Sequence, residues 1–455
     1  MRRASLAGGS SRVWNLLAAS RGHRCLAVIV LLALAVRVAV VAADGGYEPA
    51  NDAFEYDYTA RSIAAGDGYP RSGYLLHGGP TAIRAPGYPY LLGGVYALSD
   101  DSRTAGRLAG AALGALAVLL LYLISKRIWG RRIGLIAATM AAVFPPLVLL
   151  SRDLVSESLF IAVMLGALLC AIEFRRSGGA LRWAASAGAL CGLAALTRNA
   201  GLVLLLPVVL GVWAPRSRLR QATLAAPALA LACAALVTAP WIARNAVEFG
   251  RFVPVTTSGG IAAAGTYNDA SRGDSGSHGA WRTPQVLPQF APLFVTRGID
   301  EATLDAELRR DARDFAWQHP EYAVETSVWN FLRLFEIVGG SVVDDEGRVV
   351  DDRGIGSAIP APERAGLAIA VALALLGVFA ILQARSTSRA GREAPQIPSG
   401  PLFLWLAPIL MIAIALPVAG LPRYRLPADP FLLILSAVGL AWLWDRNVAG
   451  RRIEQ

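Results

Sequence analysis

Long apolar runs alternate with short arginine-rich segments along most of the chain. An apolar stretch of about 20 residues crosses the hydrocarbon core as a helix, because lipid cannot satisfy backbone polar groups. The runs lie at residues 26–43, 105–125, 133–150, 156–172, 183–197, 200–214, 221–243, 366–383, 401–419 and 427–444. The pattern predicts an all-α polytopic membrane protein with about ten transmembrane helices.

The fifth and sixth runs are short, and only Arg198 and Asn199 separate them, so one broken helix is an alternative. Arginines flank the pair on both sides: Arg175, Arg176 and Arg182 before it, and Arg216, Arg218 and Arg220 after it. Basic flanks are cytoplasmic. Two cytoplasmic flanks require an even number of crossings or a re-entrant hairpin, which favours two helices.

The remaining basic residues orient the chain. They are Arg2, Arg3, Arg12, Arg21 and Arg24 before the first run, Lys126, Arg127, Arg131 and Arg132 after the second, Arg385, Arg389 and Arg392 after the eighth, and Arg446, Arg451 and Arg452 after the last. The positive-inside rule places all of them in the cytoplasm. Val41-Ala42-Ala43 resembles a signal-peptide cleavage site, but Arg37 interrupts the run and no soluble domain follows, which favours an uncleaved anchor.

This orientation predicts five parts. Residues 1–25 and 445–455 are cytoplasmic tails, 26–243 form a transmembrane catalytic module of seven spans, 244–365 are external, and 366–444 hold the C-terminal transmembrane helices. Residues 44–104 form a first external loop whose many tyrosines suit interfacial helices. In the second loop we expect turn-rich sequence over 256–281, a helix starting near Asp300, a break at His319-Pro320, and a further helix resting on the membrane or the bundle.

Composition agrees with a membrane protein. Of 455 residues, 55% are hydrophobic and only 17% are charged, which a water-soluble fold could hardly accommodate on its surface. The net charge of +10 comes from arginines between apolar runs, so it indicates topology and not nucleic-acid binding. The four cysteines lie in or beside apolar runs without metal-like spacing, and we expect them to be packing residues.

The densest polar segment follows the first span, from Asn51 to Arg61. A carboxylate just beyond a span, on a short helix against a bundle, is partly desolvated and suits a general base near neutral pH. By position alone, Asp52, Glu55, Asp57 and Asp67 are all candidates for this role. Glu55, Asp57 and Asp67 are each more simply interpreted as a solvated face.

Several motifs resemble one family. Asp52, Tyr56 and Ala60-Arg61 match the Asp-Glu-x-x-Tyr-x-x-x-Ala pattern of the family 39 branch of glycosyltransferase superfamily C, which includes protein O-mannosyltransferases and the lipid A aminoarabinose transferase. The match continues in Arg84-Ala85-Pro86-Gly87-Tyr88-Pro89, Ser156-Glu157-Ser158, Gly192–Arg198, Pro240–Asn245 with Phe249-Gly250, and Arg423–Pro427. Each motif is weak alone, but their order on the external side is specific.

The resemblance implies an enzyme of the bacterial plasma membrane. It takes a sugar from a polyprenyl-phosphate donor and transfers it, with inversion, to an extracytoplasmic acceptor: a protein, a lipid or a cell-envelope glycan. Asp52 is then the general base, supported by Glu55, Tyr56 and Glu157. The leaving lipid phosphate needs positive charge nearby, and the candidates at the external rim are Arg84, Arg198, Arg244, Arg423 and Arg425, with Tyr424 beside them.

One position departs from the family pattern, which has a second acid where this chain has Ala53. We therefore expect no obligatory metal and no cofactor. Glu157 enters a span, where a buried acid is functional or paired, for example with Arg152. For Arg37 and Asp429 the alternative to a functional role is a side chain that only reaches to the interface.

Two other classes of protein stay open. A transporter has a similar number of spans, but it usually has related halves and ionisable residues near the midplane. A catalytically silent relative that serves as a binding or assembly subunit is compatible with Ala53.

Overall fold

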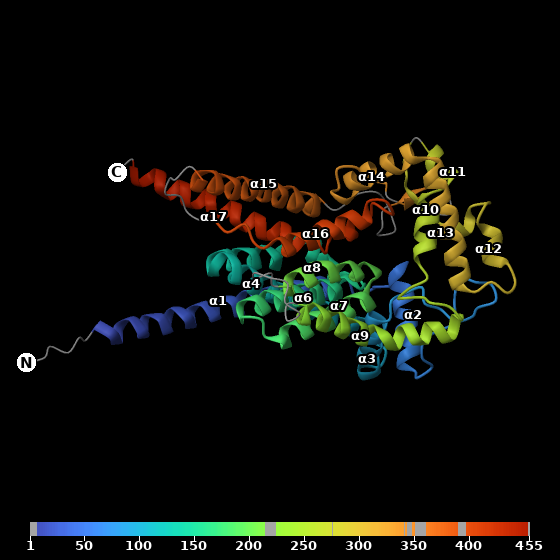
Figure 1. Cartoon of the computed structure of the whole chain (residues 1–455), viewed down its shortest axis with the longest axis horizontal. Coiled ribbons are helices and arrows are strands. Elements are labelled where there is room, and N and C mark those ends of the chain that lie inside the picture. Colours follow the sequence, from blue (N-terminus) through green and yellow to red (C-terminus); the bar gives the residue numbers. More distant parts are fainter. Residues whose placement is uncertain are drawn as a thin grey trace, which may run out of the picture.

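The computed structural model describes residues 7–213, 224–274, 276–340, 342–343, 348–350, 361–389 and 397–453. Within them the chain is helical apart from one small sheet. Arg2, Arg3, Arg216, Arg218, Arg220 and Arg392, which support the predicted orientation, lie outside the described residues. In Figure 1 the long helices run side by side along the molecule, both termini lie at one end, and α10 to α13 gather at the other.

Helices of the bundle occupy the predicted apolar runs. They are α1 (Ala7–Ala43), α4 (Arg103–Val143), α5 (Pro145–Leu149), α6 (Glu157–Arg176), α7 (Leu181–Thr197), η2 (Asn199–Leu204), α8 (Leu205–Val212), α9 (Ala225–Phe249), α15 (Ala361–Arg389), α16 (Leu402–Ala415) and α17 (Asp429–Ile453). Among the described residues, six helices are long and apolar enough to span a membrane, and three shorter apolar helices accompany them. The fold is an all-α membrane protein, and the count of ten crossings stays a prediction.

Helix α4 consists of two arms that meet at Gly130. Gly130 has φ 87° and ψ 172°, a non-helical conformation open mainly to glycine. A Cβ on Gly134 would lie 3.1 Å from the carbonyl oxygen of Tyr122, whereas these residues are about 18 Å apart along a straight helix. The chain therefore folds back at Gly130, and the two predicted spans 105–125 and 133–150 begin in separate arms.

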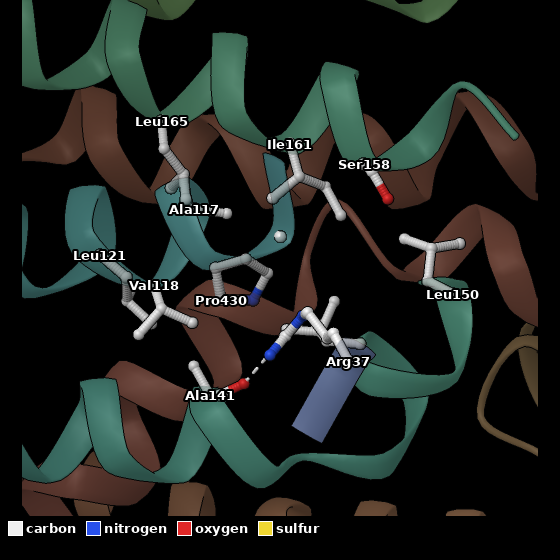
Figure 2. Close-up of a pocket in the computed structure, with 12 residues that line it drawn as sticks. Arg37, Ala117, Val118, Leu121, Ala141, Leu150, Ser158, Ile161, Leu165 and Pro430 are labelled. Atoms are coloured by element: carbon white, nitrogen blue, oxygen red, sulfur yellow. Dashed lines mark hydrogen bonds between the residues drawn. The ribbon is translucent and has the colours of Figure 1, made fainter. Parts of the chain in front are cut away.

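Arg37 joins α1 to the end of the second arm. The carbonyl groups of Ala141 and Ala142 would normally accept from residues 145 and 146, but both are prolines and have no N–H. Arg37 donates to these two oxygens at 3.3 and 3.1 Å, and Figure 2 shows it beside a small apolar cavity. The side chain is 1% exposed, so protein encloses it on all sides. It caps a helix that proline leaves unsatisfied.

The end of the molecule that carries α10 to α13 is built from the segments predicted to be external. Its elements are α2 (Asp52–Ala64), α3 (Gly87–Ser99), η1 (Leu150–Arg152), α10 (Gly259–Thr266), α11 (Asp269–Gly273), η4 (Pro284–Val286), α12 (Ala291–Val295), α13 (Glu301–Gln318), α14 (Pro320–Leu334) and η5 (Pro422–Arg425). Strand β1 (Trp281–Arg282) pairs in parallel with β2 (Val342–Val343), which pairs antiparallel with β3 (Val349–Val350).

The segment predicted to be the second external loop follows its expected helical boundaries. Asp300 caps α13 by accepting from the N–H of Thr303, and the helix ends before Pro320, which starts α14. The stretch 256–281, expected to be turns, also contains the short helices α10 and α11. Asn330 of α14 donates to the carbonyl oxygen of Leu416 at 2.9 Å, so α14 rests on the C-terminal part of the bundle. The predicted division into five parts stays a prediction.

Candidate functional site

Asp52 opens α2, and its two carboxylate oxygens face two arginines from distant parts of the chain. Arg84, from the segment before α3, donates to Oδ1. The Nη2 atom of Arg423, in η5, lies 2.5 Å from Oδ2. The side chains of Asp52, Arg84 and Arg423 are 22%, 19% and 19% exposed, so solvent screens the contacts only partly.

This pairing controls the acidity of Asp52. Burial alone would raise the pKa of the carboxyl group, but Arg423 and Arg84, with Arg198 farther off, outweigh it and hold the pKa well below its usual range. In this arrangement Asp52 is a stable carboxylate with both oxygens engaged.

Glu55 extends the contact along the same face of α2. It lies one turn after Asp52, and its Oε2 accepts from Nε of Arg84 at 2.5 Å. Tyr74 donates its hydroxyl to the other carboxylate oxygen of Glu55. The guanidinium of Arg84 also lies 5.6 Å from the centre of the Tyr56 ring. Arg84 is thus fixed between two carboxylates and an aromatic face.

Tyr56 connects α2 with the third arginine. Its hydroxyl donates to Oγ of Ser156 at 3.1 Å, and Arg198 donates to the same Oγ at 3.0 Å. Arg198 Nη1 is 2.5 Å from Oε1 of the buried Glu157. The expected partner of Glu157, Arg152, instead lies 3.8 Å from Asp44, so that pairing was wrong.

Tyr424 contacts two of these arginines. The guanidinium carbons of Arg198 and Arg423 are each 5.5 Å from the centre of its ring. The electron-rich ring attracts both cations, which offsets part of the repulsion between them. We call Asp52, Glu55, Glu157, Arg84, Arg198 and Arg423 the arginine–carboxylate cluster; its formal charges balance.

Two predicted phosphate ligands lie outside this cluster. Arg244 donates to the carbonyl oxygen of Thr81 at 2.9 Å and stacks on Tyr69, Trp241 and Phe249. Arg244 thus connects α9 to the segment before α3 that contains Thr81.

Arg425 is buried in a separate ion-pair network. Its Nε donates to Asp429 at 2.9 Å, and its Nη1 lies 3.0 Å from Glu336 and donates to the carbonyl oxygen of Leu334 at 2.6 Å. Asp429 is 1% exposed, so this ion pair is enclosed by protein. These partners use the guanidinium of Arg425 to join η5, α14 and α17.

Sequence reasoning missed Asp153. Its Oδ1 accepts from the hydroxyl of Tyr47 and from the N–H of Leu154. Burial raises the pKa of this carboxyl group, and Arg423 is among the charges that act on it. Its position just before the Ser156-Glu157 motif was the available signal.

The remaining acids of the segment predicted to be the first external loop differ in their burial. Asp57 was expected on a solvated face, but it is buried and accepts from Tyr96, Arg61 and Arg103. Asp67 is exposed, as expected. Within the described part of the chain, no three His, Cys, Asp or Glu side chains gather as a metal site would require. The expectation that no metal is obligatory stays a prediction.

Comparisons with known proteins agree with the resemblance to superfamily C glycosyltransferases. A family model described as dolichyl-phosphate-mannose-protein mannosyltransferase matches residues 83–243, which include Arg84 and Arg198. No curated protein matches the chain.

Solved structures show the fold. The chain is similar to the archaeal oligosaccharyltransferase AglB from Archaeoglobus fulgidus, in complex with an inhibitory peptide and a dolichol-phosphate. That match has TM-score 0.54 and 16% identity, and it covers 95% of this chain and 51% of AglB. The apo form gives TM-score 0.54 at 17% identity, with 95% and 52% covered. ArnT from Cupriavidus metallidurans, bound to undecaprenyl phosphate, gives TM-score 0.42 at 17% identity, with 91% and 76% covered. The chain spans about half the length of AglB.

Proposed function

We propose that the chain is a membrane glycosyltransferase of the bacterial plasma membrane. It transfers a sugar from a polyprenyl-phosphate donor to an acceptor on the extracytoplasmic side, with inversion at the anomeric carbon. The observation that carries the proposal is the meeting of Arg84 and Arg423 at Asp52. These contacts place the proposed base beside two cations that can bind a phosphate. They lie shortly after the end of α1, where a lipid-linked donor would present its phosphate.

The reaction needs one proton acceptor and a stabilised leaving group. The acceptor oxygen attacks the anomeric carbon and gives its proton to the Asp52 carboxylate. The bond from the anomeric carbon to the phosphate oxygen breaks, and its electron pair leaves with the polyprenyl phosphate. Inversion follows because the acceptor and the phosphate lie on opposite faces of the sugar.

Arginines suit this leaving group. A sugar phosphodiester carries one negative charge, and the released phosphomonoester carries more, so positive charge favours the transition state over the bound donor. Arg84 and Arg423 each present planar donors to a carboxylate now, and phosphate oxygens accept from the same geometry. Arg198 contacts the same Tyr424 ring as Arg423.

The residue directly after Asp52 is apolar, whereas the family pattern has an acid at this position. Ala53 is 1% exposed and packs in the main hydrophobic core. Glu55 carries the second carboxylate of the helix face instead, and it binds Arg84. We therefore assign Glu55 and Tyr56 to the positioning of Arg84, and Glu157 to the positioning of Arg198.

One observation favours a catalytically silent relative: a carboxylate held by two arginines is a weak base. Transfer by the purified chain distinguishes the two functions. The chain in lipid nanodiscs receives radiolabelled polyprenyl-phosphate sugars and an extract of envelope acceptors, and label leaving the lipid phase is measured. An enzyme moves the label, and Asp52→Asn does not. Donor that binds but is never consumed would establish the silent relative. Mass spectrometry of envelope glycans, with and without the protein, then identifies the product.

A further inference from the structure

Both oxygens of the carboxylate assigned as the base are occupied by the arginines assigned to the phosphate. Arg84 binds Oδ1, and Arg423 lies 2.5 Å from Oδ2. The same guanidinium edges therefore serve two anions, Asp52 and the donor phosphate.

We propose that the donor phosphate switches on the base: by taking over Arg84 and Arg423, it releases the Asp52 carboxylate to accept the proton of the acceptor. This inference rests on the proposed function. It places donor binding before proton transfer, because without donor each Asp52 oxygen is paired with an arginine and the carboxylate is a weak base.

The charges around Asp52 support this exchange. The charges that act on Asp52 are Arg423 in η5, Arg84 from the segment before α3 and Arg198 after α7. The groups around these arginines are Glu55 and Tyr56 on α2, Tyr424 in η5, and Asp153 and Glu157 around the start of α6. A phosphate placed among them adds negative charge next to Asp52 and removes its cationic partners. Both changes favour the protonated carboxyl group.

The two other carboxylates keep the arginines in place during the exchange. Arg84 stays bonded through Nε to Glu55, so a phosphate can replace Asp52 as the partner of Nη2 without the side chain leaving the site. Arg198 is held by Glu157 and Ser156 and is not an Asp52 ligand at hydrogen-bond distance among the contacts described. Asp52 is therefore the carboxylate that loses both partners when a phosphate binds.

Proton uptake on binding is the direct consequence. If the phosphate raises the proton affinity of Asp52, binding takes up a proton between the two pKa values. The affinity then rises as the pH falls through the pKa of the bound state, by up to about tenfold per pH unit. If the ligand stays singly charged over this pH range, the proton that is taken up must bind to the protein.

Farnesyl methyl phosphate, a short prenyl phosphodiester, is such a probe. Its binding to the full chain in detergent is measured by calorimetry from pH 4.5 to 8, in two buffers that differ in ionisation enthalpy. We expect proton uptake and tighter binding at low pH in the wild type. Uptake disappears in Asp52→Asn.

A control outside the site is Asp305→Asn, which removes an acid whose Oδ2 lies 2.5 Å from Arg309 on α13. It should leave the proton uptake unchanged. Uptake that persists in Asp52→Asn, or affinity independent of pH in the wild type, overturns the switch while leaving a phosphate site intact. A diester that does not bind at any pH overturns the proposed function together with the switch.

Discussion

Arg423 and Asp52 lie near opposite ends of the chain, yet Nη2 of the arginine is 2.5 Å from Oδ2 of the aspartate. The contact joins η5, just before the last helix, to α2, just after the first. The site therefore forms only when the first and the last parts of the chain pack together. Substitutions can distinguish the residues assigned to chemistry from those assigned to stability.

Asp52→Asn should abolish most transfer. The amide keeps the shape of the side chain but cannot take up a proton at neutral pH, so turnover should fall by roughly a hundredfold or more. Donor binding should survive or strengthen, because Arg84 and Arg423 lose a competing anion. The measurement is single-turnover transfer beside donor affinity. Asp67→Asn, an exposed acid on the same segment, is the control and should be mild. Near-normal transfer by Asp52→Asn, with loss in Glu55→Gln or Glu157→Gln, would move the base to those residues.

Arg423→Gln should weaken use of the donor more than it weakens the fold. A charge-assisted hydrogen bond is worth about 1.5–3 kcal/mol, which corresponds to a roughly tenfold to hundredfold higher KM for the donor. Transfer kinetics at varied donor concentration would measure this. Arg309→Gln removes an external arginine that is also paired with an aspartate, and its KM should match the wild type. An unchanged KM in both Arg423→Gln and Arg84→Gln would remove these arginines from the phosphate site.

Arg425→Ala should act on stability instead. The substitution leaves Asp429 and Glu336 buried without their cation, and breaking such a buried pair costs about 3–5 kcal/mol. Thermal unfolding in detergent should therefore show a clear decrease in Tm. The neighbouring Arg423→Ala change affects a partly exposed pair and should shift Tm much less. Similar shifts in the two variants would argue against separate roles.

Arg37→Met should destabilise the packing of α1 against the second arm of α4, whose end Arg37 caps. The carbonyl groups of Ala141 and Ala142 would lose their donor where the following prolines offer none. An unsatisfied buried group costs roughly 1–3 kcal/mol. Unfolding in detergent measures the loss. Arg24→Met, at an exposed position of the same helix, is the matched control. Equal stability of the two variants would show that the cap contributes nothing.

Cysteine labelling tests the orientation of the chain. In a variant lacking the four native cysteines, Thr296→Cys in the second external segment should react with an impermeant reagent on intact cells. Ser386→Cys near the end of α15 should not react until the membrane is opened. Both positions are exposed, so a difference reports the side of the membrane. The reverse labelling would invert the topology and remove the proposed donor geometry.

Local features of the fold were readable from the sequence because they depend on neighbours in the chain. Apolar runs predicted the helices, since lipid forces backbone groups to pair within a segment. Asp300 and Pro320 marked the start and the break of the external helices, because capping and proline act over a few residues. The position of Asp52 just beyond the first span was likewise a local feature.

The choice of partners was decided only by the tertiary structure. Arg84, Arg198, Arg244, Arg423 and Arg425 all appear at the same rim in the sequence, and nothing in their neighbours distinguishes them. Packing brings Arg84 and Arg423 to Asp52 and sends Arg425, two residues beyond Arg423, to Asp429. Such contacts depend on how helices that are distant in the sequence pack together, and the residues around each arginine do not indicate that packing.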